Sequence, residues 1–599
     1  MTPNLIAHRN AGDALAERVA EHPERAALTI YRGPAAAGQE TVTFAELARR
    51  AQLRAAALGE RLASGDRVLI ALPTCTEFVE LYLACLLAGM VAVPAPVPGG
   101  SANAAERVAA IAGDCKPAVA FTTDGDRAAM AERLAGHGLG YVPVEQPGAA
   151  GPGEARAPAR LRRPDQDTLA VLQYSSGATG APKGVMLAHG DILADIAAFG
   201  ACCGIGPGDS IGSWIPLHHD MGLFAQLSAG LLFGAPSILM PSADFVRRPV
   251  QWFTMMDRFG VTITAAPNFA YDLCQRVIAD EQLDGLDLSR LRIAFNGSEP
   301  IHAPTMAAFS KRFARTGLRP ESVTPAYGLA EATVFVSAKP PGVPATVIVA
   351  DPLRLESAER PELRATSRAG KQIVSVGRST GFQTRIVDQQ TRQALPDGAI
   401  GEVWLRGPGI GRGYWNQPEL SERTFAAALA DDGNAGDDGN ARDGGQGWLR
   451  TGDLGAFVDG ELFLTGRIKE MLIVRGRNLF PHDLEQEARA AHPALAGFVG
   501  AAFGVAVPDE RIVLVHEVSP KVQASDLPAI AAAVTRHLTA AVGAPVRNVL
   551  LVRRGTVRRT TSGKIQRGAT RARFLAGDIA ALHADLEPAV LAVTGGPHD

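Results

Sequence analysis

Hydrophobic and polar positions follow a regular order in the first part of the chain. Residues 44–62 (FAELARRAQLRAAALGERL) place apolar side chains three and four positions apart, which predicts an amphipathic helix. Residues 66–73 (DRVLIALP) form a short apolar run that predicts a buried strand, and residues 77–89 (EFVELYLACLLAG) predict another helix. This alternation of strand and helix is typical of an open α/β sheet.

The same rhythm recurs between residues 165 and 335. Four short strands are predicted there, each followed by a loop that contains Gly or Pro: TLAVLQY at 168–174, SIGSWIP at 210–216, VTITAAP at 261–267 and LRIAFN at 291–296. In open α/β sheets, ligands bind beyond the carboxyl ends of the strands. We therefore expect the chemically important residues in these loops.

The pattern changes at Gln372. Four alternating segments (QIVSVGR, FQTRIVD, EVWLRGP and ELFLTGR) predict a smaller β subdomain that ends before residue 466. Beyond Lys469 the pattern is compact α+β, over about 130 residues, which is a usual size for a small domain. The sequence thus predicts a large domain at residues 1–468, with two α/β subdomains and a β subdomain, and a small domain at residues 469–599.

Composition narrows the class of protein. The chain has 599 residues, of which 46% are hydrophobic and 20% are charged, as in globular proteins with sizeable cores. Its formal net charge of −3 provides no basic field for a polyanion, so a nucleic-acid partner is not expected. The Gly- and Asp-rich stretch at residues 428–447 has little to bury and is predicted to be a surface loop without an assigned function.

Neither a metal cluster nor a targeting segment is evident. The six cysteines lack the paired spacing of a zinc site and the density of a disulfide framework, so reduced core thiols are expected. The first 25 residues contain no apolar segment of the signal-peptide type. The two most apolar stretches, which start at Leu81 and Leu223, are interrupted by Pro, Gly, Ser or Gln. We expect a cytoplasmic protein without a transmembrane segment.

The segment from Leu172 to Asp191 (LQYSSGATGAPKGVMLAHGD) joins an apolar strand to a loop of small and hydroxyl residues that contains a lysine. Glycines let a backbone approach a charged ligand, and hydroxyl and N–H groups donate to phosphate oxygens. It is not a Walker loop, because Pro182 replaces the second glycine and Gly184 follows the lysine. The predicted phosphate-binding residues are Ser175, Ser176, Gly177, Thr179, Gly180 and Lys183.

This loop, SSGATGAPKG, resembles the phosphate loop of the adenylate-forming superfamily, which includes acyl-CoA synthetases, luciferases, adenylation domains and fatty acyl-AMP ligases. Further segments occur in the expected order: WIPLHHDMGL, NGSEPI, PAYGLAEAT, RTGDLG, GRIKEMLIVRGRNLFP and TSGKIQR. The resemblance covers essentially the whole chain. It implies the α/β fold of that superfamily, with a large N-terminal region of several subdomains and a small mobile α+β C-terminal domain. It also implies that ATP and Mg²⁺ are used to convert a carboxylate into an acyl-adenylate.

The resemblance assigns the catalytic roles residue by residue. Attack of a carboxylate on the α-phosphate brings two anions together, so the site needs positive charge. Lys564, in TSGKIQR, would enter from the small domain and bridge the two anions. Glu331, in YGLAEAT, would bind the magnesium ion, as a hard carboxylate suits. His219, in HHDMG, would border the carboxylate end of the acyl pocket.

Nucleotide contacts are implied in the same way. Asp453, in RTGDLG, has an acceptor carboxylate suited to the ribose hydroxyls, and Arg467 has a matching donor fork. Lys469 matches the hinge about which the small domain rotates. The predicted contacts of the adenine are Asn296, Gly297, Ser298 and Glu299 on one loop, and Ala326, Tyr327 and Gly328 on the facing one.

Two positions differ from the residues that are frequent in the family. Ala178 stands where Ser or Thr is frequent, which removes one hydroxyl from the phosphate loop. Arg558 and Arg559 precede TSGK where Pro and Lys are frequent, which keeps the positive charge but changes the stiffness of the backbone.

The segment near residues 338–372 decides the branch of the superfamily. It resembles the insertion that distinguishes fatty acyl-AMP ligases from acyl-CoA synthetases, and it implies a restrained C-terminal domain. The leading hypothesis is therefore adenylation of a fatty acid, with transfer to the phosphopantetheine thiol of an acyl carrier protein in trans, for lipid, polyketide or nonribosomal peptide biosynthesis. An acyl-CoA synthetase is the alternative enzyme. A noncatalytic acyl- or nucleotide-binding module is the alternative from another class.

Overall fold

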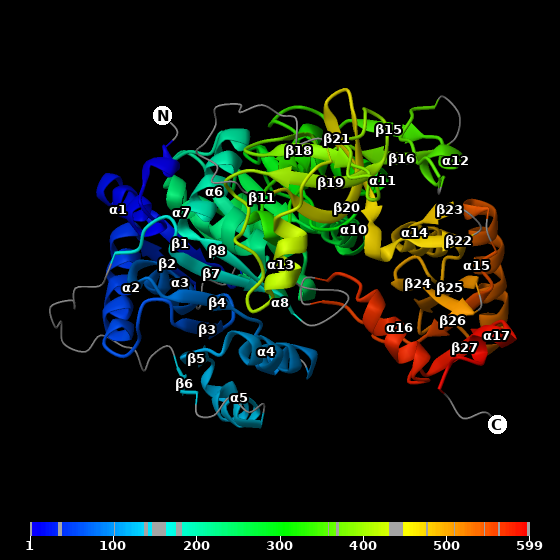
Figure 1. Cartoon of the computed structure of the whole chain (residues 1–599), viewed down its shortest axis with the longest axis horizontal. Helices are drawn as coiled ribbons and strands as arrows, with labels where there is room; N and C mark the ends of the chain where they lie inside the picture. The colour runs from blue at the N-terminus through cyan, green and yellow to red at the C-terminus, as the bar shows by residue number, and fades with distance from the viewer. Residues whose placement is uncertain are drawn as a thin grey trace.

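The computed structural model of the chain shows a large body and a smaller lobe made by the C-terminal elements (Figure 1). It describes residues 3–33, 39–100, 102–136, 142–146, 163–174, 182–357, 359–366, 370–430, 447–474, 477–507, 509–543, 545–560 and 563–595.

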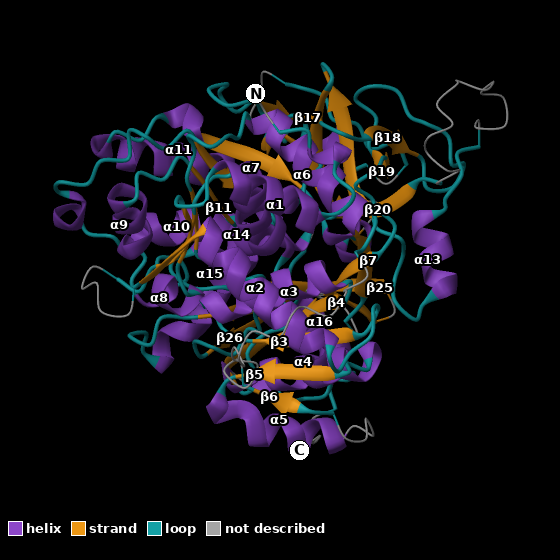
Figure 2. Ribbon diagram, turned by 90° about the vertical axis from the view of Figure 1, so that its left-hand side faces the viewer, coloured by secondary structure: helices purple, strands orange, loops and turns teal. Residues whose placement is uncertain are grey.

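The first α/β subdomain is built on a six-stranded sheet in the order β6-β5-β3-β4-β7-β8, in which β8 alone runs antiparallel to its neighbour. Its strands are β3 (Arg67–Ala71), β4 (Val91–Pro94), β5 (Val119–Thr122), β6 (Val144–Glu145), β7 (Leu169–Tyr174) and β8 (Gly184–Ala188). Its helices are α2 (Phe44–Gly59), α3 (Thr76–Ala88), α4 (Ala102–Cys115) and α5 (Asp124–Gly136). The helix-strand-helix order predicted for residues 44–89 is confirmed. In both views α4 and α5 lie together at one end of the body, next to β5 and β6 (Figures 1 and 2).

Helix α2 shows how the sequence sets local structure. The Thr43 hydroxyl accepts a hydrogen bond from the Glu46 N–H and caps the helix. The apolar side chains at three- and four-residue spacing are buried against the core: Phe44, Leu47, Ala51, Ala55 and Leu58.

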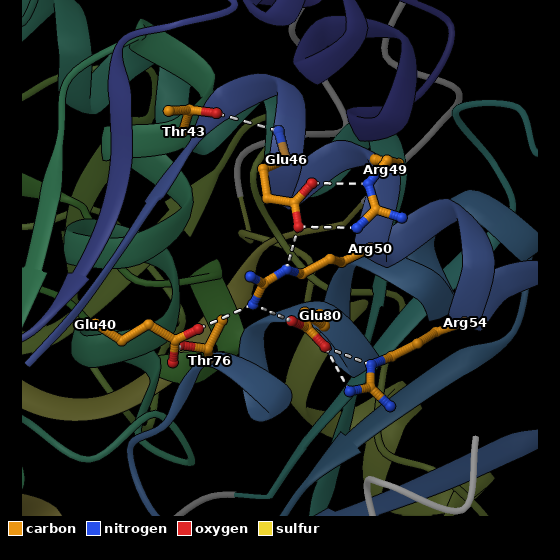
Figure 3. Close-up of polar contacts among 8 residues, drawn as sticks. All are labelled: Glu40, Thr43, Glu46, Arg49, Arg50, Arg54, Thr76 and Glu80. Carbon is orange, nitrogen blue, oxygen red and sulfur yellow. Dashed lines mark hydrogen bonds and ion pairs between the residues drawn. The ribbon is translucent and has the colours of Figure 1, made fainter. Parts of the chain in front are cut away.

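A network of ion pairs fastens the other face of α2 to α3 and to β2 (Glu40–Thr43) (Figure 3). Arg54 binds the carboxylate of Glu80, which is only 3% exposed. Arg50 reaches three carboxylates, those of Glu40, Glu46 and Glu80. The network therefore connects helix α2 both to helix α3 and to strand β2.

The second α/β subdomain carries a nine-stranded sheet in the order β17-β14-β13-β12-β11-β9-β10-β1-β2. Its further strands are β1 (Ala26–Ile30), β9 (Ile211–Ser213), β10 (Ser237–Leu239), β11 (Ile263–Ala266), β12 (Ile293–Asn296), β13 (Val323–Tyr327), β14 (Ser337–Ala338) and β17 (Arg378–Ser379). Its helices are α1 (Ala11–Glu21), α6 (His189–Cys203), α7 (Ala229–Phe233), α8 (Ser242–Arg247), α9 (Val250–Arg258), α10 (Asn268–Val277) and α11 (Ala303–Phe313). The four strands predicted between residues 165 and 335 are present, but one lies in the first sheet and three lie in this one.

The β-rich region expected after Gln372 is also present. An antiparallel sheet contains β18 (Gln383–Val387), β19 (Gly401–Arg406), β20 (Leu449–Val458) and β21 (Glu461–Arg467), and helix α13 (Pro418–Phe425) contacts β20. The segment near residues 338–372 forms a hairpin of β15 (Val347–Ala350) and β16 (Lys371–Val374), with the short helix α12 (Pro352–Leu355) between them.

The C-terminal lobe has its own apolar core. A hairpin of β22 (Leu472–Val474) and β23 (Arg477–Leu479) is followed by a four-stranded sheet in the order β24-β25-β26-β27. Its remaining elements are β24 (Gly500–Val507), β25 (Asp509–Glu517), β26 (Asn548–Val552), β27 (Ala581–Asp585), α14 (Pro481–Ala491), α15 (Leu527–Val542), α16 (Arg567–Leu575) and α17 (Pro588–Leu591). Two clusters of buried residues form this core, and both lie wholly after residue 468. The domain boundary at residue 468 itself stays a prediction.

Two expectations from the sequence concern cysteines and membranes. All six cysteines are free thiols. Within the described part of the chain, no helix combines the length and apolar character needed to cross a membrane.

Candidate active site

The predicted phosphate loop connects two antiparallel strands. Tyr174 ends β7 and pairs in register with Gly184, the first residue of β8. Ser175, Ser176, Gly177, Ala178, Thr179 and Gly180 lie outside the described residues. The strand end is held by a hydrogen bond of 2.5 Å from the Tyr174 hydroxyl to Asp114 of α4, a contact that the sequence did not predict. The base of the loop is therefore fixed by the first subdomain.

Lys183 and Glu331 both contact Tyr414. The Tyr414 hydroxyl donates to the Glu331 carboxylate over 2.8 Å, and the Lys183 ammonium lies 4.9 Å from the centre of the Tyr414 ring. Burial and the positive charge of Lys469 lower the pKa of Lys183, while Glu331 opposes the shift. The predicted phosphate, magnesium and hinge residues therefore act on one another's charges.

The loops predicted to bind adenine follow adjacent parallel strands. Asn296 ends β12 and pairs in register with Pro325 of β13. A Cβ added at Gly297 would lie 2.8 Å from the Ala326 carbonyl oxygen, and one at Gly328 would lie 1.6 Å from the carbonyl oxygen of Val334. The two glycines are thus required by the close approach of the backbones.

Two further residues of this loop are constrained. Ser298 has a φ of 70°, in the left-handed region that is uncommon for serine. The Glu299 carboxylate accepts the N–H of Phe269 over 2.5 Å, and burial raises the pKa of Glu299. The Asn296 side chain donates to Asn268 over 3.0 Å. Its buried Oδ1 has no partner among the described residues, so it remains able to accept a hydrogen bond from a ligand.

Asp453 accepts hydrogen bonds from Arg467, its expected neighbour, and from Tyr327, which was predicted to contact the adenine instead. The Tyr327 hydroxyl donates to its Oδ2 over 2.7 Å, and Arg467 Nε donates to its Oδ1 over 2.8 Å. Asp453 and Arg467 are register partners on β20 and β21, and Asp453 is 5% exposed. The charge of Asp453 raises the pKa of Arg467 further above its ordinary value.

His219 contacts an acid that sequence reasoning missed. Its Nδ1 lies 2.6 Å from Asp220 Oδ1, and its Nε2 lies 3.5 Å from the Ser298 hydroxyl. Burial raises the pKa of Asp220, but the charges of His219 and Lys564 outweigh it, so the pKa lies below its usual range. The sequence showed that His219 and Asp220 are adjacent in HHDMG. It did not show that the charge of Asp220 acts on Lys564.

Lys564 comes from the C-terminal lobe and reaches this same region. It is carried by a hairpin in which the Thr560 N–H donates to the Lys564 carbonyl over 2.8 Å. Burial lowers the pKa of the Lys564 ammonium, and Asp220 is the strongest of the groups that oppose the shift. Arg467 lowers it further, whereas Glu299 and Asp453 raise it. Residues from four separate motifs therefore act on the charge of Lys564.

A sequence profile of the AMP-binding enzyme family matches residues 15–415. The chain belongs to this family. In this AMP-binding enzyme, acidic and basic groups of the large N-terminal part act on the charge of Lys564.

Individual relatives of this AMP-binding enzyme have fatty acids in their names. It is 35% identical over 583 residues to a protein of Mycobacterium tuberculosis named as a fatty-acid–CoA ligase, with 92% of this chain and 95% of the relative covered. It is 34% identical over 556 residues to a medium-chain-fatty-acid–[acyl-carrier-protein] ligase of Moorena producens, with 90% of each chain covered.

A solved structure from work on fatty acyl-adenylate ligases of E. coli and L. pneumophila superposes on this AMP-binding enzyme with a TM-score of 0.83. The two are 28% identical, and 95% of this chain and 98% of that one are covered. The expected adenylate-forming fold is confirmed.

No group of three or more His, Cys, Asp or Glu side chains that could hold a metal occurs among the described residues. Mg²⁺ needs fewer protein ligands, because it is usually held by one or two carboxylates together with phosphates and water. Glu331 uses Oε1 to accept from Tyr414, so its other oxygen remains a suitable hard ligand. The residues present therefore fit a magnesium ion that arrives with a nucleotide.

Proposed function

We propose that this AMP-binding enzyme activates a fatty acid with ATP to form acyl-AMP and pyrophosphate. It then transfers the acyl group to the phosphopantetheine thiol of an acyl carrier protein supplied in trans. The observation that supports the first step is that Arg467 bonds Asp453 and interacts through its charge with both Glu331 and Lys564, which come from separate motifs. The names of the relatives support a fatty acid as the substrate. A cytoplasmic location and the absence of a nucleic-acid partner belong to the same proposal.

The proposed roles follow from charge and position. Asp453 and Arg467 would hold the ribose, because the carboxylate accepts and the guanidinium donates. Asn296 would accept from the adenine through its buried Oδ1, and Tyr327 would provide a ring face. Lys183 and the loop before it would contact the phosphates. When bound at Glu331, Mg²⁺ would neutralise phosphate charge.

Lys564 would act on the charge that develops during adenylation. The charge of Asp220, which contacts His219, favours the charged form of this ammonium, and the fatty-acid carboxylate would enter near these two residues. In a partly buried site a fixed positive charge stabilises two approaching anions more than it would in water. The lysine therefore favours the transition state of attack on the α-phosphate.

The segment near residues 338–372 supports transfer to a carrier protein over transfer to free CoA. Glu356 forms an ion pair with Arg477, and the Asn478 N–H donates to the Glu356 carbonyl over 2.7 Å. Lys371 forms an ion pair with Asp483 of α14. This segment therefore contacts the C-terminal lobe at the base of its first hairpin and first helix, where it would restrain rotation of the lobe.

An acyl-CoA synthetase is the second candidate, because several relatives are named as fatty-acid–CoA ligases. Incubation of the enzyme with ATP, Mg²⁺ and a panel of fatty acids distinguishes the two. Acyl-AMP, acyl-CoA and acyl-carrier protein are measured together by mass spectrometry. We expect acyl-AMP in every reaction with an accepted fatty acid and little acyl-CoA. Abundant acyl-CoA would favour the synthetase, and no pyrophosphate release with any fatty acid would favour a binding module.

A further inference from the structure

Lys564 belongs to a β-hairpin whose base is two residue pairs away from it. The Thr560 N–H donates to the Lys564 carbonyl over 2.8 Å, and the Gln566 N–H donates to the Arg558 carbonyl over 2.9 Å. A bridge between Arg559 and Ile565 lies between these two pairs. The position of Arg558 therefore determines the position of the lysine, because the paired backbone makes the hairpin one stiff unit.

Two contacts hold this hairpin on the large body. Near its tip, Gly563 adopts a φ of +88°, and a Cβ added there would lie 2.6 Å from Cε1 of Phe269. At its base, Arg558 Nη1 donates to Asn103 Oδ1 over 3.1 Å. The first contact is apolar and non-directional, whereas the second is a directional hydrogen bond from a charged donor.

Helix α4 connects this second contact to the phosphate loop. Asn103 and Arg107 are four residues apart, so their side chains lie on the same face of α4. Arg107 Nη2 donates to the carbonyl of Tyr174 over 3.3 Å, and Tyr174 is the last residue of β7. One helix face therefore contacts both the strand that leads into the phosphate loop and the hairpin that carries the lysine.

We propose that Asn103 and Arg558 are positioning residues, which align the Lys564 hairpin with the end of β7 through α4 for acyl-adenylate formation. This inference rests on the proposed role of Lys564. Asn103 and Arg558 touch no reacting atom and act through the lysine. A displacement of about 1 Å at a catalytic group can lower the rate roughly 100-fold. A contact that aligns a hairpin from the other lobe can therefore have a large effect on the rate.

This role also explains why position 558 has an arginine where proline is frequent in the family. A proline there could not reach across to α4, whereas arginine has a long side chain with five donors. Arg559 is the matched comparison, because it has the same charge and lies next to Arg558 but is exposed.

The test compares Arg558→Ala, Asn103→Ala, the double variant and the control Arg559→Ala, each as the full chain. Pyrophosphate release with ATP and a saturating fatty acid gives kcat and KM, and thermal unfolding checks the fold. We expect Arg558→Ala and Asn103→Ala each to lower kcat about 10-fold with a nearly unchanged KM for ATP. The double variant should be no slower than either single one, and Arg559→Ala should stay within about twofold. Asn103→Asp should keep most of the rate, because a carboxylate still accepts from Arg558.

A second measurement separates positioning from a general structural effect. Arg558→Ala is combined with Lys564→Ala, and the residual acyl-AMP is counted from radiolabelled fatty acid. We expect no further loss, because the arginine acts only through the lysine. Near wild-type rates for Arg558→Ala and Asn103→Ala, effects that multiply in the double variant, or a further loss in the Lys564→Ala background would each overturn the inference. If Lys564→Ala itself keeps the wild-type rate, the proposed role of Lys564 fails and this inference fails with it.

Discussion

At the scale of single residues, Lys564 combines two properties that usually oppose each other. It is a cation, yet it is partly withdrawn from water, and burial lowers its pKa. The carboxylates of Asp220, Glu299 and Asp453 counter this effect and favour the charged form. The lysine can therefore present a poorly solvated positive charge to an anionic substrate.

Lys564→Ala should remove most acyl-adenylate formation while ATP binding stays within a few-fold, because the ammonium acts on charge that develops during transfer. Pyrophosphate release and an ATP dissociation constant from calorimetry measure the two effects. Because the pKa of Lys564 lies below 10.5, the ordinary lysine value, kcat/KM should fall on the alkaline side at a lower pH than an ordinary lysine would give. Adenylation by Lys564→Ala at the wild-type rate would contradict the assignment.

Asp453→Ala should instead weaken ATP binding by about 10-fold or more, since ribose contacts are present before and during the reaction. Asp459→Asn is a suitable control, because Asp459 is exposed at the turn of the same β20–β21 hairpin and its φ of 53° suits asparagine. Calorimetric titration with ATP compares the two variants. An unchanged dissociation constant in a folded Asp453→Ala protein would count against a ribose contact.

At the scale of secondary-structure elements, the packing of α2 against α3 depends on charges as well as on apolar side chains. Glu80 lies on α3 and is almost fully buried, and it accepts from both Arg50 and Arg54 of α2 (Figure 3). Breaking a buried ion pair from one side is far more costly than breaking an exposed one. Substitution of Glu80 should therefore lower the stability of the protein more than substitution of an exposed residue of the network.

Glu80→Gln should destabilise the protein by about 3 kcal/mol, because it leaves buried positive charge without its carboxylate. Glu46→Gln removes a more exposed carboxylate of the same network and should cost less than about 1 kcal/mol. Differential scanning fluorimetry should show a drop of at least about 5 °C in the first transition for Glu80→Gln and a small change for Glu46→Gln. Equal shifts of the transition temperature in the two variants would show that the burial of Glu80 does not increase its contribution to stability.

At the scale of the whole molecule, the segment near residues 338–372 joins the large body to the C-terminal lobe. Leu355 and Ile373 from this segment share an apolar cluster with Phe480, which precedes α14. The ion pairs of Glu356 with Arg477 and of Lys371 with Asp483 surround that cluster. In the proposed function, these apolar and ionic contacts would oppose rotation of the lobe about Lys469.

Deleting residues 351–370 should leave acyl-AMP formation largely intact and raise acyl-CoA formation from a very low level. In the proposed function, adenylation uses the phosphate loop and Lys564, both outside the deletion, whereas thioester formation would require the lobe to rotate. The deletion can shift the two arrangements only by the contact energy that is lost, so a partial gain is expected. Mass spectrometry of both products measures it.

A point variant provides a finer test of the same restraint. Glu356→Ala removes the ion pair to the lobe, whereas Arg354→Ala removes an exposed pair with Glu362 that stays within the segment. Only the first should raise acyl-CoA formation. An equal rise in both variants, or none in the deletion, would argue that the segment does not restrain the lobe.

The amino-acid sequence by itself determined many of the elements and proposed the residues of the candidate site. Periodicity indicated α2, β3 and α3, because the spacing of apolar side chains reflects which face is buried. The family resemblance pointed to Lys564, Asp453 and Glu331, and the type of charge that each carries suits one part of the reaction. Their roles stay predictions.

Only the tertiary structure decided which distant residues meet. Tyr414 contacts Glu331 across 83 positions of the chain, and Arg558 contacts Asn103 across 455. The spacing of apolar residues along the chain does not reveal such pairs, because a side-chain hydrogen bond between distant residues depends on how whole elements pack. The restraint of the C-terminal lobe was implied by family resemblance alone and stays a prediction, whereas the ion pairs of Glu356 with Arg477 and of Lys371 with Asp483 became visible in the structure. Local patterning follows from the covalent order of side chains, whereas the assembly of the site follows from the packing of two lobes that are separately folded around their own apolar cores.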